Sequence, residues 1–528
     1  MARFFFFGLA IILLLSFSIT KYIPQMNIIW VIIAPMVLVA LWDFFQKKSA
    51  IKRNFPIIGR FRYLFEMVRP EIQQYFIEAN SEGMPFSREV RSVIYQRSKK
   101  ALETLPFGTQ KNLYEDGYEW ANHSLMPTHV KTETLRVKIG ETSCQQPYNA
   151  SIFNISAMSF GSLSKNAIMA LNKGAHLGNF SHNTGEGGIS PYHLQGGDLV
   201  WQLGTAYFGS RTREGKFCPS KFQDNAQNPV VKMIEIKLSQ GAKPGHGGIL
   251  PAGKLTKEVA EIRGVPLGND VISPPCHSEF STPIQLIEFV QKLRELSQGK
   301  PVGFKLCLGK PREFYAICKA MKLLDCTPDF ITVDGAEGGT GAAPLEFSNY
   351  IGTPLTDAIV LIHNALVGFD LRKKVKIIAS GKITTGFDIM RSLALGADLC
   401  NSARGMMMSL GCIQALKCNT NHCPTGVATQ SSELQRGLVV SDKKYRVYHY
   451  HSQTLDSFCE ILGSLGVSSH LKLKPWHVMR RTPSGETKHF GRIYHYLNPG
   501  ELTSSDLPFE YRHAVESASA ETFQYCGG

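Results

Sequence analysis

Two uncharged apolar runs open the chain. The first spans residues 4–19 and the second spans residues 28–42, with a short polar break around Lys21 and Pro24. Each run approaches the ~20 residues that a helix needs to cross a bilayer. A signal peptide is one alternative, but no small-residue cleavage site follows the first run and the second run comes at once. We therefore predict a transmembrane helical hairpin over residues 1–46, with an amphipathic or buried helix pair as the other alternative.

From about residue 151 onward, apolar strand-like segments alternate with segments of helical periodicity. Repeated units of this kind form parallel sheets. About eight units fit this part of the chain, which favours a (β/α)8 TIM barrel over an open doubly wound sheet. The predicted strands are Ile152–Met158, Met233–Leu238, Val302–Leu306, Phe330–Val333, Val375–Ser380 and Asp398–Asn401. The predicted helices start near Ser164 and span Pro283–Leu296, Pro311–Leu323, Thr356–Phe369 and Thr385–Leu395.

The texture of the chain also predicts its domain boundaries. Residues 47–150 are predicted to form a basic juxtamembrane segment and a helical adaptor, and residues 151–430 are predicted to form the barrel. Residues 431–528 have weaker patterns and are predicted to form a helical extension packed on the barrel. No repeat of 20–50 residues is present.

The distribution of charge sharpens this picture. Of 528 residues, 43% are hydrophobic and 19% are charged, which excludes a disordered chain. The net charge of +14 suggests nucleic acid, a membrane surface or an anionic ligand. Residues 47–100 hold twelve Lys and Arg against five Glu, a balance of +7 and half of the whole excess. The positive-inside rule therefore predicts a cytoplasmic-membrane protein with its body in the cytoplasm and membrane lipid as a partner; no nucleic-acid signature accompanies the charge.

Glycines and polar residues gather where the predicted strands end. The segments Asp334–Gly341, Ser380–Ile383 and Ser402–Gly405 resemble phosphate-binding loops, because glycine lets backbone N–H groups approach phosphate and a following helix N-terminus adds a favourable dipole. In barrels, phosphate commonly binds after the seventh and eighth strands. A phosphate-bearing cofactor such as FMN fits this arrangement, with Lys237 and Lys305 at strand ends available to a reduced flavin or a carboxylate.

Three cysteines form the sharpest local motif. Cys412, Cys418 and Cys423 fall within twelve residues, and Pro424 follows the last of them. Thiolates this close in sequence hold iron–sulfur clusters, whereas zinc needs a fourth ligand and His422 is badly placed for it. The spacing favours a three-iron cluster, and buried, unreactive thiols are the alternative. The other cysteines lie mostly in apolar runs, which is typical of reduced thiols.

Five motifs together resemble the FMN-binding synthase domain of glutamate synthase. They are Ala157–Ser164, Asn183–Gly188, Gln240–Gly245, Gly338–Pro344 and Cys412–Gln430, and the resemblance covers roughly residues 100–470 in matching order. It implies a (β/α)8 barrel, FMN and a [3Fe–4S] cluster on Cys412, Cys418 and Cys423. It also implies reductive amination of 2-oxoglutarate to glutamate by hydride from reduced FMN, which the iron–sulfur centre supplies with electrons.

The resemblance also assigns roles to single residues. Glu186, Lys237, Gln240 and Lys305 form the predicted catalytic set, with Glu186 as the candidate general acid and a lysine, Lys237 or Lys243, paired with the dicarboxylate. Met158 and Ser159, together with Lys305, are expected beside the flavin ring. The residues expected to hold the FMN phosphate are Gly338, Gly339, Thr340, Gly381, Lys382, Ala403 and Arg404.

Two departures from the family bear on function. Full glutamate synthases begin with a glutaminase domain, whereas this chain starts Met1-Ala2-Arg3 and leads into an apolar run, so we expect ammonia from solution or from a partner. The family string of two prolines and two histidines is replaced here by Pro274-Pro275-Cys276-His277, which puts the substrate in question. The membrane hairpin suggests electron exchange with a membrane carrier or a donor subunit.

These observations leave alternatives open. An amine-transfer synthase of the N-methylglutamate type is the nearest alternative enzyme. A non-catalytic, membrane-tethered flavoprotein that serves as a redox subunit is a second class, and a basic nucleic-acid-binding protein is a third.

Overall fold

The computed structural model describes residues 2–101 and 103–525, and of residues 2–5 only the backbone. The chain divides into two compact units, Met1–Arg88 and Glu89–Gly528. The larger unit holds the predicted barrel, and the smaller one holds the two apolar runs.

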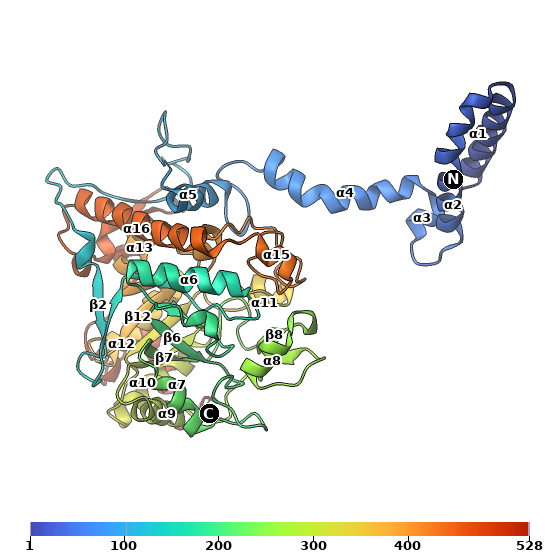
Figure 1. Ribbon diagram of the computed structural model, residues 1–528. Coiled ribbons are helices and arrows are strands. Elements are labelled where there is room, and N and C mark those ends of the chain that lie inside the picture. The colour runs from blue at the N-terminus through green and yellow to red at the C-terminus, as the bar shows by residue number, and fades with distance from the viewer. Residues whose placement is uncertain (1, 102, 526–528) are drawn as a thin grey trace. The chain divides into compact units, whose positions relative to one another are not determined.

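Eight parallel strands close into a barrel in the larger unit (Figure 1). The predicted TIM barrel is therefore confirmed, and the open doubly wound sheet is excluded. Most strand residues are buried, as expected for parallel strands with helices outside and a packed interior. In ring order the strands are β4 (Phe153–Ile155), β5 (His182–Asn183), β6 (Leu199–Leu203), β7 (Val231–Lys237), β10 (Val302–Leu306), β11 (Phe330–Asp334), β12 (Lys376–Ser380) and β13 (Leu399–Ser402).

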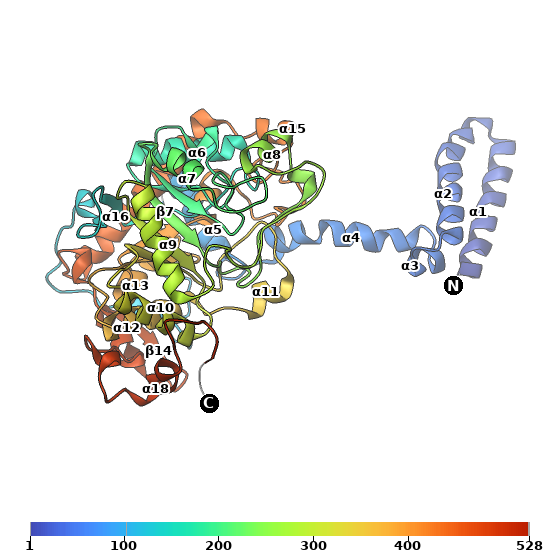
Figure 2. The same ribbon diagram turned by 90° about the horizontal axis from the view of Figure 1, so that it is seen from below.

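Amphipathic helices cover the outside of the barrel (Figure 2). Most begin at a Ser, Thr or Pro that satisfies or removes a free backbone N–H group. The longest, α16 (Val440–Ser464), packs against α6 and α13 and closes the ring of helices, so the barrel continues past residue 430. The other covering helices are α6 (Lys165–Gly178), α7 (Pro219–Ala226), α9 (Pro283–Leu296), α10 (Pro311–Leu323), α12 (Leu355–Gly368) and α13 (Gly386–Leu395).

The segments around the barrel are less helical than the pattern predicted. After α5 (Arg88–Lys99), the predicted adaptor contributes the strand β1 (Glu119–Ala121) and the antiparallel pair β2 (Arg136–Ile139) and β3 (Tyr148–Ser151). β1 pairs with β14 (Val478–Arg481), which itself pairs with β15 (Thr487–His489). The predicted C-terminal extension thus forms a small sheet with the segment that precedes the barrel. The chain ends in the short helices α17 (Phe490–Ile493) and α18 (Phe509–Glu516).

The smaller unit consists of helices. The apolar runs form α1 (Ala2–Tyr22) and, after a 3-10 turn η1 (Pro24–Ile28), α2 (Ile29–Phe45). The Phe6 and Phe44 rings lie 5.0 Å apart, so the two helices run antiparallel as the predicted hairpin requires. Two further helices follow, α3 (Ala50–Asn54) and α4 (Ile58–Ile72), and then a π-helical turn η2 (Gln73–Ile77).

One segment of the described chain, Pro24–Phe45, is long and apolar enough to cross a membrane. The first helix, α1, is also apolar over Phe6–Tyr22, the part of it whose side chains the structure describes. Signal sequences and buried helices of soluble proteins meet the same criterion, so length and composition alone do not place this segment in a bilayer.

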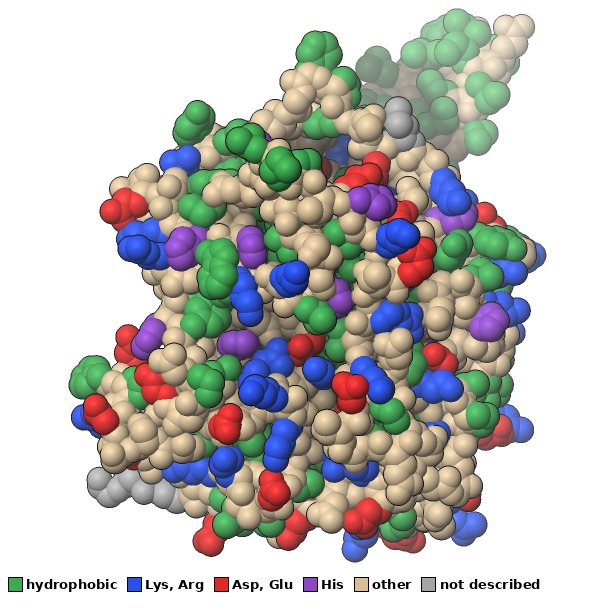
Figure 3. All heavy atoms as spheres, turned by 90° about the vertical axis from the view of Figure 1, so that its left-hand side faces the viewer, with side chains coloured by type: hydrophobic (Ala, Val, Ile, Leu, Met, Phe, Trp, Pro, Cys, Tyr) green, Lys and Arg blue, Asp and Glu red, His purple; other side chains and the backbone are tan. Residues whose placement is uncertain are grey.

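Charge on the larger unit is mixed. On the face drawn in Figure 3, basic and acidic side chains are interspersed rather than gathered by sign.

Candidate functional site

A buried ion pair marks the carboxyl-terminal end of the barrel. Glu186 follows β5 and Lys237 ends β7, and the Lys237 Nζ lies 2.9 Å from the Glu186 Oε1. Glycines make room for this carboxylate, because a Cβ atom at Gly204 would lie 2.7 Å from the Glu186 Oε2 and one at Gly248 would lie 2.4 Å from Oε1. The pair lines a pocket together with Gln240, so three of the predicted catalytic residues meet.

The electrostatics of this pair fix its protonation. Burial opposes ionisation of Glu186, but the charges of Lys237, Arg263 and Lys243 outweigh it and hold the pKa of the carboxyl below its usual value. Burial also lowers the pKa of Lys237, although Glu186 opposes that effect. Burial and the charge of Lys237 lower the pKa of Lys243 to about 8. The carboxylate is therefore ionised, and any labile proton of this group lies on a lysine.

Arg263 is a site residue that the sequence analysis missed. It ends α8 (Lys257–Arg263), which lies in an excursion after β7 that also carries the short strands β8 (Ile249–Leu250) and β9 (Val271–Ile272). Its guanidinium group donates to the Phe160 carbonyl at 3.2 Å and lies 5.1 Å from the centre of the Phe208 ring. Only 5% of the residue is exposed. In the sequence, α8 has the charge pattern of an ordinary surface helix, so no local signal pointed to this arginine.

Two further charged groups lie inside the barrel. Lys305 pairs in register with Lys237 on the neighbouring strand and is 5% exposed, and among the described residues no ion pair or hydrogen bond joins its ammonium group. Glu235, which the sequence analysis also missed, accepts hydrogen bonds from Asn183, Gln202 and Thr332 at 2.6–2.8 Å. The one sequence signal for Glu235 was that its carboxylate interrupts an otherwise apolar strand. Glu235 and Lys237 are two residues apart on one strand and therefore face the same side.

The predicted phosphate loops approach one another closely. A Cβ atom at Gly339 would lie 2.6 Å from the Arg404 Nε, so only glycine lets this guanidinium lie across the loop. Arg404 also donates to the Glu337 carbonyl at 2.5 Å. Burial, the charge of Arg404 and that of Glu337 act together on Lys382, and the net effect lowers its pKa. The structure thus brings Gly339, Lys382 and Arg404 together, whereas Thr340 is exposed.

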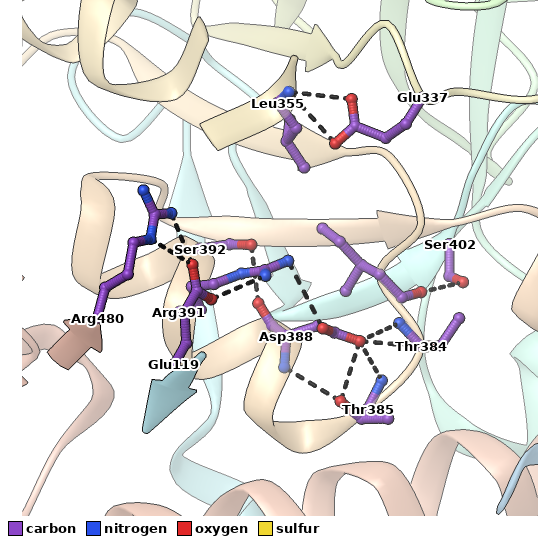
Figure 4. A network of polar contacts seen from close by, with 11 residues as sticks. Glu119, Glu337, Leu355, Thr384, Thr385, Asp388, Arg391, Ser392, Ser402 and Arg480 are labelled. Atoms are coloured by element: carbon purple, nitrogen blue, oxygen red, sulfur yellow. Dashed lines mark hydrogen bonds and ion pairs between the residues drawn. The ribbon is translucent and has the colours of Figure 1, made fainter. Parts of the chain in front are cut away.

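Two helix N-termini near these loops, those of α12 and α13, are already capped, contrary to the expectation that their dipoles are available to phosphate. Figure 4 shows Asp388 accepting from the backbone and side chains of Thr384 and Thr385, which closes the first turn of α13. Glu337 accepts the Leu355 N–H at the start of α12, also drawn there. Carboxylates therefore occupy both N-termini. Cationic side chains and loop glycines are left as the groups that suit a phosphate.

The loop after β4 links the pocket to the cysteine motif. Gly185 packs against it, since a Cβ there would lie 2.7 Å from the Ser159 backbone nitrogen. On its other side, the Gln430 side chain donates to the Gly161 and Leu163 carbonyls at 3.0 and 2.9 Å. The buried Lys254 ammonium, also missed from the sequence, donates to the Ser162 carbonyl at 2.6 Å and to the Cys418 carbonyl at 3.2 Å. Met158 and Ser159 therefore lie in a loop that joins the pocket to the cysteines.

The surroundings of the three cysteines suit a cluster. Burial opposes ionisation of Cys423, but backbone N–H groups of Ala428, Thr425 and Val427 donate to its sulfur and lower the pKa of the thiol. Burial raises the pKa of Cys412 to about 12, and the charges of the other two thiols add to this rise. No group of three or more His, Cys, Asp or Glu side chains in the described chain converges on a single metal ion. Burial also raises the pKa of Cys418, so Cys423 is the one thiol of the three whose surroundings lower its pKa.

Within the string Pro274-Pro275-Cys276-His277, the departing residue Cys276 and the matching residue His277 differ in burial. His277 is buried, with one ring nitrogen 2.9 Å from the Tyr207 hydroxyl and the other 2.9 Å from the Lys237 carbonyl. Cys276 beside it is exposed, and all eleven described cysteines are free thiols. His277 thus braces the strand end that carries Lys237, whereas Cys276 leaves that contact unaffected.

Comparison with known proteins identifies the family of the chain. Residues 97–468 match the family model described as a conserved region in glutamate synthase. A glutamate synthase large subunit-like protein, YerD of Bacillus subtilis, is 38% identical over 513 residues, which cover 89% of this chain and 97% of that protein. The archaeal glutamate synthase [NADPH] of Methanocaldococcus jannaschii is 33% identical over 319 residues, 60% of this chain and 59% of that protein.

Among solved structures, a mandelate oxidase matches 81% of this chain and 96% of its own, with 13% identity and a TM-score of 0.42. The chain thus spans nearly all of YerD and about three fifths of the archaeal relative. The family match covers well over half of the chain. The chain belongs to the glutamate synthase family.

Proposed function

We propose that this protein is an FMN- and iron–sulfur-dependent oxidoreductase of the glutamate synthase type. In this proposal it reductively aminates 2-oxoglutarate to glutamate, with ammonia from solution or from a partner. FMN, when bound, would supply the hydride, and a [3Fe–4S] cluster on Cys412, Cys418 and Cys423 would supply electrons to it. Family membership supports the class of the enzyme, and the charges of the site support the substrate.

The excess of cationic side chains at the carboxyl end of the barrel carries the proposal. Six cationic side chains gather there against four carboxylates, and most of them are buried. Buried charges of one sign are costly unless a ligand of opposite sign neutralises them. An organic phosphate and a dicarboxylic acid supply such charge. The cations are Lys237, Lys243, Arg263, Lys305, Lys382 and Arg404, and the carboxylates are Glu186, Glu235, Asp334 and Glu337.

Each cation suits one of the two anions. Lys382 and Arg404, next to Gly339, suit the phosphate of FMN, which supplies the hydride when it is bound. Lys237, Lys243 and Arg263 surround Glu186 and suit the two carboxylates of the oxo acid, because charge-assisted hydrogen bonds to carboxylates are strong. Lys305 lies beside Lys237 on the neighbouring strand and suits a position at the flavin ring.

Proton movement in the proposal follows from the ion pair. Condensing 2-oxoglutarate with ammonia gives 2-iminoglutarate and water, and the departing oxygen needs a proton. Lys237 is the group that holds one, because burial eases proton loss from it while Glu186 stays ionised. Glu186 then acts as the carboxylate that accepts an N–H of the incoming amine, rather than as the general acid.

Cys412, Cys418 and Cys423 would hold the cluster. Gln430 and Lys254 hold the Ser159–Ser164 loop in place by hydrogen bonds. This loop therefore connects the segment that carries the three cysteines to the pocket. An electron donor, either a subunit or a membrane carrier, completes the reaction. The backbone N–H groups around Cys423 suit an ionised, metal-bound sulfur.

We further propose that the protein sits in the cytoplasmic membrane with the barrel unit in the cytoplasm. The apolar segment Pro24–Phe45 supports this location, as do the six basic residues without an acid between residues 47 and 62.

The test uses the full chain purified in detergent, with its flavin reduced anaerobically. Adding 2-oxoglutarate and ammonium should reoxidise the flavin and yield glutamate, detected by mass spectrometry. The variant Lys237→Gln should lose this reoxidation while it retains flavin. Lys232→Gln, on the same strand but with a side chain 38% exposed and facing Asp198, should behave as the parent protein does.

Replacing ammonium by methylamine tests the alternative synthase. Reoxidation with methylamine alone, yielding N-methylglutamate, would replace ammonia by that amine in the proposal. Bound flavin without reoxidation by either amine would favour a non-catalytic redox subunit. A well-folded protein that purifies without flavin would overturn the cofactor assignment.

A further inference from the structure

Helix α4 presents an apolar stripe that no other part of its unit covers. At 3.6 residues per turn, five large side chains share one face, spread over about 100° of the helix. Of these, Phe65 is 63% exposed, Phe61 51%, Leu64 45% and Ile72 42%. Gly59 is the one buried residue of the helix, where it touches Ile51 of α3. The five are Phe61, Leu64, Phe65, Val68 and Ile72.

An ion pair fixes where this helix begins. Asp43, near the end of α2, is fully buried and accepts two hydrogen bonds from Arg60, both 2.8 Å long. It also accepts the Ile57 N–H at 3.1 Å. The first turn of α4 is therefore clamped to the end of the apolar helix α2. Where α2 leaves a bilayer, α4 must start at the same level.

Charge beside the stripe has the sign that suits lipid headgroups. Arg62 and Arg69 border the apolar face, are exposed, and line a hollow along α4 and η2 with Phe65 and Ile72. Glu66 also lines it and lies 3.1 Å from Arg62 in an exposed ion pair, so basic groups outnumber acidic ones there by two to one. The preceding segment adds exposed Lys47, Lys48 and Arg53. Arginines at the edge of an apolar face place their charge among headgroups while the aromatic rings enter the acyl region.

We propose that α4 lies in the plane of the membrane, with this stripe inserted among acyl chains and Arg62 and Arg69 on anionic headgroups. The proposal rests on the membrane location proposed above and adds a second, in-plane attachment to it. A second copy of the chain is the alternative occupant. A hydrophobic face of this size, left open by the rest of its unit, is typical of a helix that binds lipid or another protein surface.

The test places a photoreactive benzophenone amino acid at single positions of the full chain in bacterial membranes. Position 65 lies in the stripe, position 66 lies on the opposite face with an exposed side chain, and position 38 in α2 is 68% exposed. After irradiation, lipid adducts at positions 38 and 65 but not at 66 are the expected result. A lipid adduct at position 38, combined with either a chain-to-chain adduct or no adduct at position 65, would overturn the in-plane helix but not the membrane location. No lipid adduct at 38 or 65 would overturn the membrane location as well.

A second experiment tests the headgroup contact. The double variant Arg62→Glu/Arg69→Glu is reconstituted in vesicles with and without an anionic phospholipid. With anionic lipid, the yield of lipid adduct at position 65 should fall at least ~3-fold relative to the parent arginines, because each basic residue at the surface contributes to attraction. In vesicles of zwitterionic lipid, the two proteins should give similar yields. An equal yield in anionic vesicles would overturn the role of the arginines.

Discussion

The two ends of the barrel hold buried charge in opposite ways. At the amino ends of the strands, Asp329 accepts hydrogen bonds from Val302 N at 2.8 Å and from Arg294 at 2.9 Å. Asp398 is held in the same manner by Arg372 at 2.8 Å. In each of these two pairs one carboxylate stands against one arginine, and further donors, the Ser143 hydroxyl to Asp329 and the Ile377 N–H to Asp398, complete the contacts.

At the carboxyl ends, cations outnumber carboxylates and one of them has no partner among the described residues. Lys305 is 5% exposed without an ion pair or hydrogen bond in that part of the chain. Lys237 has Glu186, but burial still lowers its pKa. Charged side chains are buried at both ends, but only the two amino-end pairs match each carboxylate with an arginine. A carboxylate with all its partners stabilises the fold, whereas an excess of buried cations suits an anionic ligand.

Breaking the saturated pair should have the largest effect on stability. Asp329→Ala leaves the Arg294 guanidinium buried without its carboxylate and should lower the free energy of unfolding by about 3–5 kcal/mol. Denaturant unfolding of the detergent-solubilised chain measures this change. Lys374→Ala is the matched control, since its ion pair with Asp325 is exposed, and it should leave stability nearly unchanged. A small loss for Asp329→Ala would contradict the distinction between the two ends.

Removing Lys305, the lysine without a partner among the described residues, should lower activity without lowering stability. Lys305→Met removes a buried cation that no carboxylate compensates, so stability should hold or rise by about 1 kcal/mol. Activity with 2-oxoglutarate and ammonium should fall at least ~100-fold in kcat/KM, or about 2.7 kcal/mol of transition-state stabilisation. The flavin content of the purified protein provides a readout that is independent of turnover.

Lys232→Met on the neighbouring strand serves as the control for that variant, because the Lys232 side chain is 38% exposed and should affect neither quantity. If Lys305→Met were strongly destabilising, the lysine would be a structural member of the barrel interior, and the contrast between the two ends would be lost.

The dependence of activity on pH should report the same excess of charge. Burial lowers the pKa of Lys243 to about 8, so its ammonium form prevails below pH 8 and is lost above it. Because the cation attracts a dicarboxylate, kcat/KM should fall above pH 8, at most ~10-fold per pH unit. Lys243→Arg keeps the charge and should move this limb to higher pH. An unchanged profile in that variant would assign the limb to another group, with Lys237 the first candidate.

Local patterns predicted those elements whose ends are set by nearby residues. The predicted bounds Pro283–Leu296 and Pro311–Leu323 coincide with α9 and α10, because a proline at the first turn and a continuous apolar stripe define each helix. The strand β5 has two residues, too few for any periodic pattern, and the sequence analysis gave it no bounds. The covering helix α16, which follows the last barrel strand, lay beyond the predicted boundary at residue 430, because its neighbour α6 is distant in sequence.

The site residues show the same difference between local and long-range signals. Glu186, Lys237 and Gln240 were predicted as site residues because they lie in glycine-rich segments at strand ends, and they do line one pocket. Arg263 and Lys254 were missed because their contacts, with Phe160 and Ser162, span about a hundred residues. The expectation about helix dipoles was wrong for α12 and α13 because carboxylates cap both. Capping by Glu337 depends on an 18-residue separation that no short motif reveals.

The smallest predicted effect concerns the cap of α13, beside the proposed phosphate site. Thr385→Ala removes the hydroxyl that accepts the Asp388 N–H at 3.2 Å and should cost about 1 kcal/mol of stability. Thr282→Ala removes the equivalent cap of α9, where Gln285 N–H donates at 3.2 Å, and should cost the same. The two variants should differ in flavin retention, because only the first loosens the loop that carries Lys382. Equal flavin loss in both would mean that general destabilisation, and not the geometry of this loop, governs cofactor binding at the carboxyl end of the barrel.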